Sequence, residues 1–119
     1  MEPWKIGEEL FDQGISPKLK GFHYICSVLS LLIGQRRVLT AEDAARAIRT
    51  VGGQNVRRTE CCMRYAIRRA WELGEGSIRL SFPNLSYPPA VVEFLLVTQW
   101  RLAAGAEAAD KVDKRVKRL

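Results

Sequence analysis

Five arginines lie within one short segment, residues 55 to 73, which also holds two glutamates. The planar guanidinium group of arginine can make two hydrogen bonds at once to the major-groove edge of guanine or to a phosphate. The segment carries half of the chain's net charge of +6, in a form suited to a polyanionic partner. The alternative interpretation is a solvated basic face without a partner.

Helical spacing in this segment separates apolar from basic residues. One side of such a helix holds Val56, Thr59, Met63, Ala66, Ile67 and Ala70. The other side holds Arg57, Arg58, Cys61, Tyr65, Arg68 and Arg69, with Arg64 at the border. A helix over 56–73 would be about 27 Å long, enough to lie in the major groove of DNA while its apolar side packs on a core.

A helix that lies in the major groove also predicts individual contacts. In DNA-binding proteins of the helix-turn-helix type, residues near the N-terminus of such a helix reach the base edges. We expect groove contacts from Arg57, Arg58, Glu60, Cys61 and Arg64. We expect phosphate contacts from Arg68 and Arg69, which come later in the helix.

Other chemistry finds little support in the sequence. The single histidine, His23, lacks a cysteine or carboxylate at useful spacing, and the acidic residues are scattered singly. Cys26, Cys61 and Cys62 show no C-x-x-C spacing. Oxidation of Cys61 or Cys62 could act as a redox switch, but Cys62 more simply packs as a small apolar residue. We predict no enzyme, metal site, cofactor or small-molecule substrate.

Length and composition indicate one domain. The chain has 119 residues, 47% of them hydrophobic and 27% charged, as in globular proteins. The N-terminus lacks the pattern of a signal peptide, and the longest apolar run, residues 28 to 33, is too short to cross a bilayer. We therefore expect a cytoplasmic protein without a membrane segment.

Turn and cap residues divide the chain into helices. Gly14 ends a helix over residues 4–13, and Ser16 with Pro17 begins one that Gly34 closes. Thr40 and Asp43 form a capping box before a short helix that ends near residue 49. Asn55 caps the helix over 56–73, and Gly74 ends it. An irregular connection over 75–89, with or without a short extended piece at 77–82, leads to a last helix from about residue 89.

The predicted fold is all-α, a compact single-domain bundle of about five or six helices. The glycine turn at 51–53 joins the helix over 41–49, with Ala44, Ala45 and Ile48 inward, to the arginine-rich helix, which is the arrangement of a helix-turn-helix. We predict a helix-turn-helix domain over 1–105 and a charged tail over 106–119 that either extends the last helix or is disordered. That last helix is apolar on more than one side, which favours a homodimer.

Three stretches of the chain carry motifs of one known family. The first has a glycine, an aliphatic residue, a proline and then Lys-Gly-aromatic, here Gly14, Ile15, Pro17, Lys20, Gly21 and Phe22. The second comprises Arg58-Thr59-Glu60, Arg64 to Ile67, Ala70-Trp71 and Gly74, and the third Pro89, Glu93-Phe94 and Arg101-Leu102. These stretches resemble the effector domain of the stage-zero sporulation protein A response regulators, the second its recognition helix and the third its final helix. The resemblance covers roughly residues 6 to 104.

The resemblance implies a transcription factor of spore-forming bacteria that binds tandem DNA sites. By position, Arg58, Glu60 and Arg64 match the family's DNA-contact residues, whereas Cys61 stands where the family usually has arginine. The family's N-terminal receiver domain has no counterpart in these 119 residues. If they are the natural product, phosphorylation of a receiver is not expected to switch it; if they are a fragment, its regulation lies outside this sequence.

The leading hypothesis is thus a regulator that binds a specific double-stranded DNA sequence. Two alternatives remain. One is a protein-interaction module that modulates another regulator through the last helix and tail, and the other is a nonspecific nucleic-acid binder.

Overall fold

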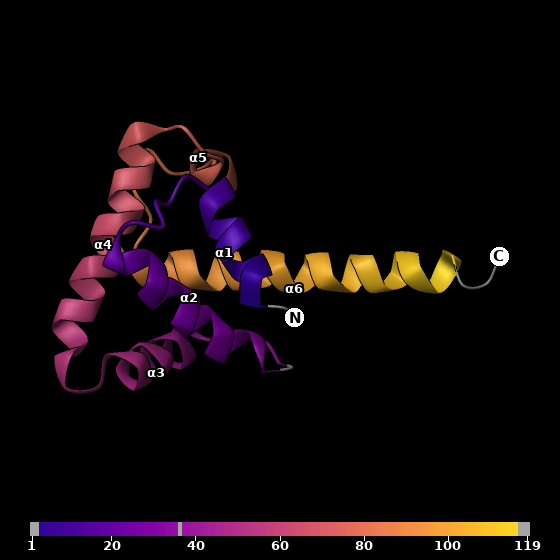
Figure 1. The fold of residues 1–119 in the computed structure, drawn as a ribbon, viewed down its shortest axis with the longest axis horizontal. Coiled ribbons are helices and arrows are strands. Elements are labelled where there is room, and N and C mark those ends of the chain that lie inside the picture. The colour runs from indigo at the N-terminus through magenta and orange to yellow at the C-terminus, as the bar shows by residue number, and fades with distance from the viewer. Residues whose placement is uncertain (1–2, 36, 117–119) are drawn as a thin grey trace.

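The chain folds into a succession of helices, shown in Figure 1 as a computed structural model that describes residues 3–35 and 37–116, with side chains in helix α6 described as far as residue 105. Within these residues there is no strand, so the all-α prediction is confirmed. The elements in chain order are α1 (Pro3–Asp12), α2 (Lys20–Ile33), α3 (Ala41–Gly52), the 3-10 turn η1 (Gly53–Asn55), α4 (Val56–Leu73), the single helical turn α5 (Ile78–Ser81) and α6 (Val91–Val116).

Helix α2 forms the centre of the molecule and packs against α1, α3, α4 and α6. Its apolar residues recur every three or four positions, so they share one side of the helix and enter the core. Ile25, Val28, Leu29 and Leu32 are completely buried there. Helix α2 therefore contributes a large part of the core.

The beginning of α2 differs from the prediction, because the helix starts at Lys20 and not at Pro17. Leu19 is extended, with φ −88° and ψ 142°, which interrupts a helix at this point. The hydroxyl of Ser16 caps a tight turn, accepting from the Lys18 N–H at 3.3 Å, and the Ser16 carbonyl accepts from the Leu19 N–H at 3.2 Å. Serine and proline here form a turn before the helix.

Gly21, near the start of α2, allows α2 and α4 to touch along their backbones. A Cβ atom at this position would lie 2.1 Å from the carbonyl oxygen of Cys62 and 2.8 Å from the Cβ of Ala66. No larger residue fits without moving one of the helices. The contact places the first turn of α2 directly beside the middle of α4.

The capping box at the start of α3 is confirmed. The Thr40 hydroxyl accepts from the Asp43 N–H at 3.3 Å, and the Asp43 carboxylate accepts from the Thr40 N–H at 2.7 Å. The helix extends to Gly52, beyond the predicted end near residue 49, because only Gly53, with φ 56°, leaves the right-handed region. Of the three residues expected to face inward, Ala45 is only half-buried, and Ala47 is buried in its place.

Helix α4 has the predicted bounds, and Gly74 ends it in the left-handed conformation at φ 62°. The prediction that Asn55 caps its start is wrong, because the Asn55 side chain makes no capping hydrogen bond. Its carbonyl instead accepts from the Thr59 hydroxyl at 3.0 Å. At the other end, the Arg79 guanidinium donates to the carbonyl of Trp71 at 3.0 and 2.8 Å.

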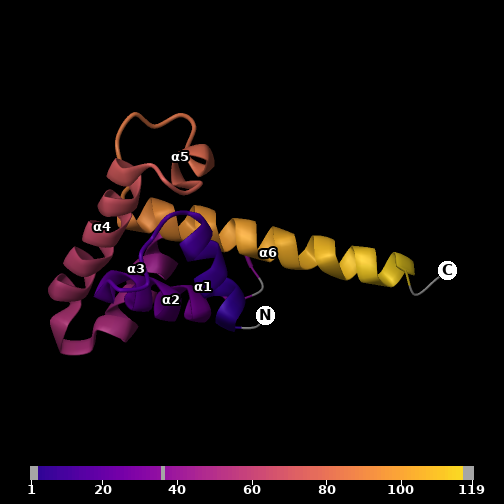
Figure 2. The same cartoon turned by 45° about the horizontal axis from the view of Figure 1, so that its top comes forward.

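The segment after α4 contains no strand among its residues, so of the two alternatives left open for 77–82, the connection without an extended piece is the one observed. Residues 78–81 form α5, because the side chain of Ile78 is completely buried and pins one helical turn onto the core. The chain then enters α6, which is continuous across the predicted boundary at residues 105 and 106 and projects beyond the rest of the molecule (Figures 1 and 2). No helix in the described ranges is long and apolar enough to cross a membrane.

Candidate nucleic-acid interface

The two sides of α4 have opposite environments. Its inner side buries Thr59, Met63, Ala66, Ile67, Ala70 and Trp71 in the core. The opposite side exposes Arg57, Arg58, Arg64, Arg68 and Arg69, which we call the arginine face. Because the inner side packs against α2 and α3, the helix is held rigidly while all five guanidinium groups point into solvent.

The arginine face consists of two adjacent stripes. Arg57, Cys61, Arg64 and Arg68 follow one another at intervals of four, three and four residues, which places them along one line of the helix. Arg58, Tyr65 and Arg69 form the second line, at intervals of seven and four. Arg64, expected at the border between the two sides, is fully part of the exposed face.

Glu60 and Cys61 differ from each other in exposure. Cys61 is an exposed free thiol in the middle of the first stripe, whereas Glu60 is half-buried at the edge of the face. The carboxylate of Glu60 makes no ion pair with any described residue. The structure therefore places all seven predicted contact residues on one helix, six of them exposed and Glu60 at the margin.

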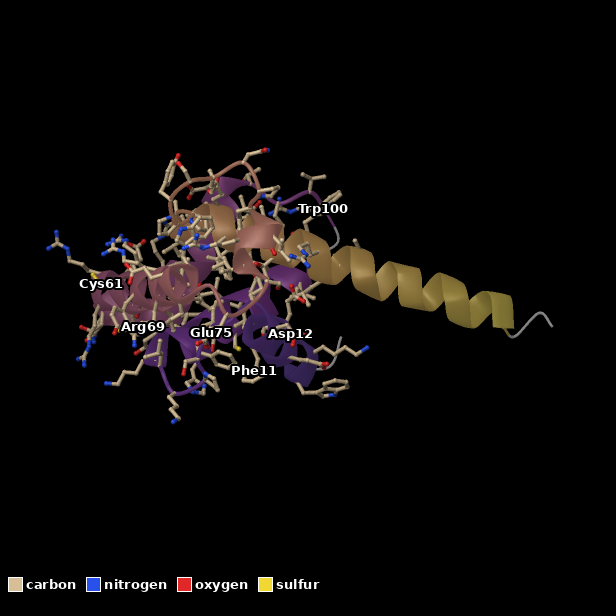
Figure 3. All side chains as sticks on the ribbon, turned by 90° about the horizontal axis from the view of Figure 1, so that it is seen from above. Phe11, Asp12, Cys61, Arg69, Glu75 and Trp100 are labelled. Carbon is tan, nitrogen blue, oxygen red and sulfur yellow. The ribbon has the colours of Figure 1, made fainter. Side chains whose placement is uncertain are left out.

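The orientation of the neighbouring helix leaves the arginine face open. Figure 1 shows α3 and α4 meeting at the turn η1 and diverging from it, so that α3 does not run along the outer side of α4. Figure 3 shows Cys61 and Arg69 at the end of the molecule opposite the projecting part of α6. A long rod-shaped ligand could approach this end without meeting α6.

The arginine face makes no polar contact with the rest of the described chain. None of its five arginines takes part in an ion pair or donates a side-chain hydrogen bond to a described residue. Charged groups left free on a rigid surface keep their full capacity to bind an anion, because no internal bond must be broken first.

Arg37, in the basic loop before α3, serves a different purpose from the α4 arginines. Its guanidinium donates to both oxygens of the Asp43 carboxylate, at 3.0 and 2.6 Å. This pair, with the hydrogen bonds from Thr40, holds the pKa of Asp43 well below its usual range, and the same contact raises the pKa of Arg37. The sequence interpretation missed the pair, although Asp43 belongs to the recognisable capping box and Arg37 lies three residues before it.

The remaining candidates for chemistry are dispersed. The His23 ring is exposed, with Nε2 3.0 Å from the Pro17 carbonyl oxygen, and thus tethers α2 to the preceding turn. Burial raises the pKa of the Cys26 thiol on α2, which disfavours its thiolate. The described residues contain no cluster of three His, Cys, Asp or Glu side chains able to hold a metal ion.

No protein family, curated protein or solved structure matches the chain. The resemblance to sporulation effector domains therefore stays a prediction that rests on sequence motifs. The candidate interface stands on the geometry of α4 and on the absence of internal partners for its described arginines.

Proposed function

We propose that the protein is a transcription regulator that binds a specific sequence of double-stranded DNA by inserting α4 into the major groove. The arginine face carries this proposal: five exposed guanidinium groups, none paired with a described residue, lie on one side of a helix whose other side is buried. The turn η1 joins this helix to α3 as the turn joins the two helices of a helix-turn-helix.

The distribution of groups along α4 supports distinct contacts. Arg57, Arg58 and Arg64 belong to its first half, where recognition helices meet base edges, and each can pair with guanine through two hydrogen bonds. Glu60 can accept from the amino group of cytosine. Arg68 and Arg69, in the second half, are suited to phosphates of the adjacent strand.

The family resemblance supports a more specific proposal. We infer a cytoplasmic regulator related to sporulation-initiation effectors, acting on tandem DNA sites. Cys61, at a position where those domains usually have arginine, removes one bidentate donor and should change the base preferred at that step.

Selection of binding sites from random duplexes, with the purified chain at physiological salt, tests the function. An enriched motif, bound with an affinity that falls steeply as salt rises, is the expected result. Binding without enrichment would contradict sequence-specific regulation and favour the nonspecific binder. Absence of binding to any duplex would contradict both.

A second candidate function is supported by one surface on α6. Trp100 is 65% exposed and, with Val38 and Leu96, lines an apolar groove of about 250 Å³ between α6 and the loop before α3. Such a groove favours a protein partner, including a second copy of the chain. Light scattering of the wild type and of Trp100→Ala measures the oligomeric state. A wild-type dimer that the substitution dissociates would support an interaction surface at this groove. A monomer that captures no partner would contradict it.

A further inference from the structure

A hollow lies between the first turn of α2 and residues 58–65 of α4, at the edge of the arginine face. Its volume is about 330 Å³, which falls in the range of about 300–1,000 Å³ typical of small-molecule sites. The residues around it combine apolar and cationic groups: Leu19, Cys61, Cys62 and Tyr65 on the one hand, and Lys20 and Arg58 on the other.

The cationic groups come from two different helices. Lys20 belongs to the first turn of α2 and Arg58 to the first turn of α4, and neither forms an ion pair with a described residue. Two cationic side chains from different helices thus border one largely apolar hollow.

The apolar groups make the hollow different from a plain phosphate site. Leu19 is half-buried against the core, and Tyr65 is 55% exposed, so its ring is accessible from the hollow. The close contact of Gly21 with the Cys62 carbonyl keeps α2 and α4 together, so the hollow exists before any ligand arrives. A charged head group and a short apolar tail would both be accommodated.

We propose that this hollow binds a small amphipathic carboxylate and that the bound ligand competes with DNA. The carboxylate pairs with Lys20 and Arg58, and the tail covers Leu19 and Tyr65. Competition rests on the proposed function, because Arg58 belongs to the arginine face and one guanidinium group cannot serve both anions. Binding of the ligand itself does not depend on that function.

Octanoate is a suitable probe, with acetate and octanol as matched ligands that lack the tail and the charge. Titration of the full chain, followed by calorimetry or by amide chemical shifts of α2 and α4, should give saturable binding of octanoate. Acetate and octanol should each bind at least about tenfold more weakly, since each satisfies only half of the site. Equal binding of octanoate and octanol, or no saturation with octanoate, would overturn the proposal.

Variants locate the site. Lys20→Gln and Tyr65→Ala should each weaken octanoate binding at least about fivefold. Lys18→Gln is the matched control, because Lys18 is an exposed lysine two positions earlier that does not line the hollow. An equal loss with Lys18→Gln would show nonspecific attraction and refute the site.

Competition is measured separately. Octanoate should raise the apparent Kd for duplex DNA in the wild type and in Lys18→Gln, and less so in Lys20→Gln. Octanoate binding without any effect on DNA affinity would refute the regulatory half of the proposal. A protein that binds octanoate as expected but binds no DNA would refute the proposed function and leave the ligand site intact.

Discussion

The described arginines of α4 and those elsewhere in the molecule are all exposed, but they differ in whether they contact another group of the chain. Outside α4, the structure describes five arginine side chains, and each contacts a group of the chain: Arg37 and Arg46 contact Asp43, Arg49 contacts Glu42, Arg79 contacts the Trp71 carbonyl, and Arg101 contacts Ser81 and Glu9. The arginine face has no such contacts within the described residues.

The difference separates charge that serves the fold from charge that is available to a ligand. Arg37 is 54% exposed, yet both of its terminal nitrogens are occupied by Asp43. Exposure alone would therefore place Arg37 with the α4 arginines, whereas hydrogen bonding separates them. Among the arginines whose side chains the structure describes, those of α4 are the ones left without a partner in the chain and open to an anion.

The largest effect on DNA affinity is expected when three arginines of the first stripe are removed together. Arg57, Arg64 and Arg68 replaced together by alanine should lower affinity for the selected duplex at least about a hundredfold, because each contact contributes on the order of 1–3 kcal/mol. The melting temperature should change little, since none of the three forms an ion pair with any residue in the described part of the chain. Fluorescence anisotropy with labelled duplex measures the loss, and retained affinity would disprove the interface.

Single substitutions sharpen the assignment within the arginine face. Arg64→Ala should cost on the order of 1–3 kcal/mol on the selected site and relax the preference at one base pair. Arg68→Ala should weaken binding to the selected and to the random duplex by similar factors. It should also reduce the slope of log affinity against log salt concentration by about one. Affinity for a panel of single-base variants distinguishes the two. Equal losses on every duplex for Arg64→Ala would contradict its role in reading bases.

The arginines that pair within the chain should affect stability and not DNA affinity. The pH dependence of stability tests this for the pair of Arg37 with Asp43. The pKa of Asp43 is depressed in the folded protein, so the pair with Arg37 stabilises the fold above the usual carboxyl range, and this contribution is lost as pH falls toward the depressed value. Asp43→Asn should lower the melting temperature near neutral pH, and the difference from wild type should shrink as the pH falls below about 4. Thermal unfolding monitored by circular dichroism across pH measures this effect. A difference that stays constant with pH would contradict the pair's contribution.

The smallest effect is expected at Arg49, whose partner Glu42 is also exposed. The pair lies 3.0 Å apart on the surface of α3, where such bridges contribute less than about 1 kcal/mol. Arg49→Ala should leave both the melting temperature and the DNA affinity almost unchanged. It therefore serves as the control for loss of one positive charge, and a large fall in DNA affinity would extend the interface to α3.

Much of the fold could be predicted because its signals are local. The capping box of Thr40 and Asp43, the left-handed Gly74 and the three-to-four-residue spacing of apolar residues in α4 all act within a few positions of the chain. Ser16 with Pro17 misled the prediction, because the same two residues also suit a turn, and Leu19 adopts an extended conformation there. The helical turn at Ile78 escaped prediction because burial of its side chain in the core, and not local propensity, holds it.

For the candidate site, the sequence by itself determined the helix over 56–73 and the separation of its arginines from its apolar residues. Amphipathic spacing is sufficient for that, since the period of a helix is the same in every protein. Only the tertiary structure decided which arginines are free, because pairing depends on which side chains meet across a loop or between helices. It also decided that Gly21 brings α2 against α4 and so creates a hollow with cations from both, since that juxtaposition joins residues about 40 positions apart.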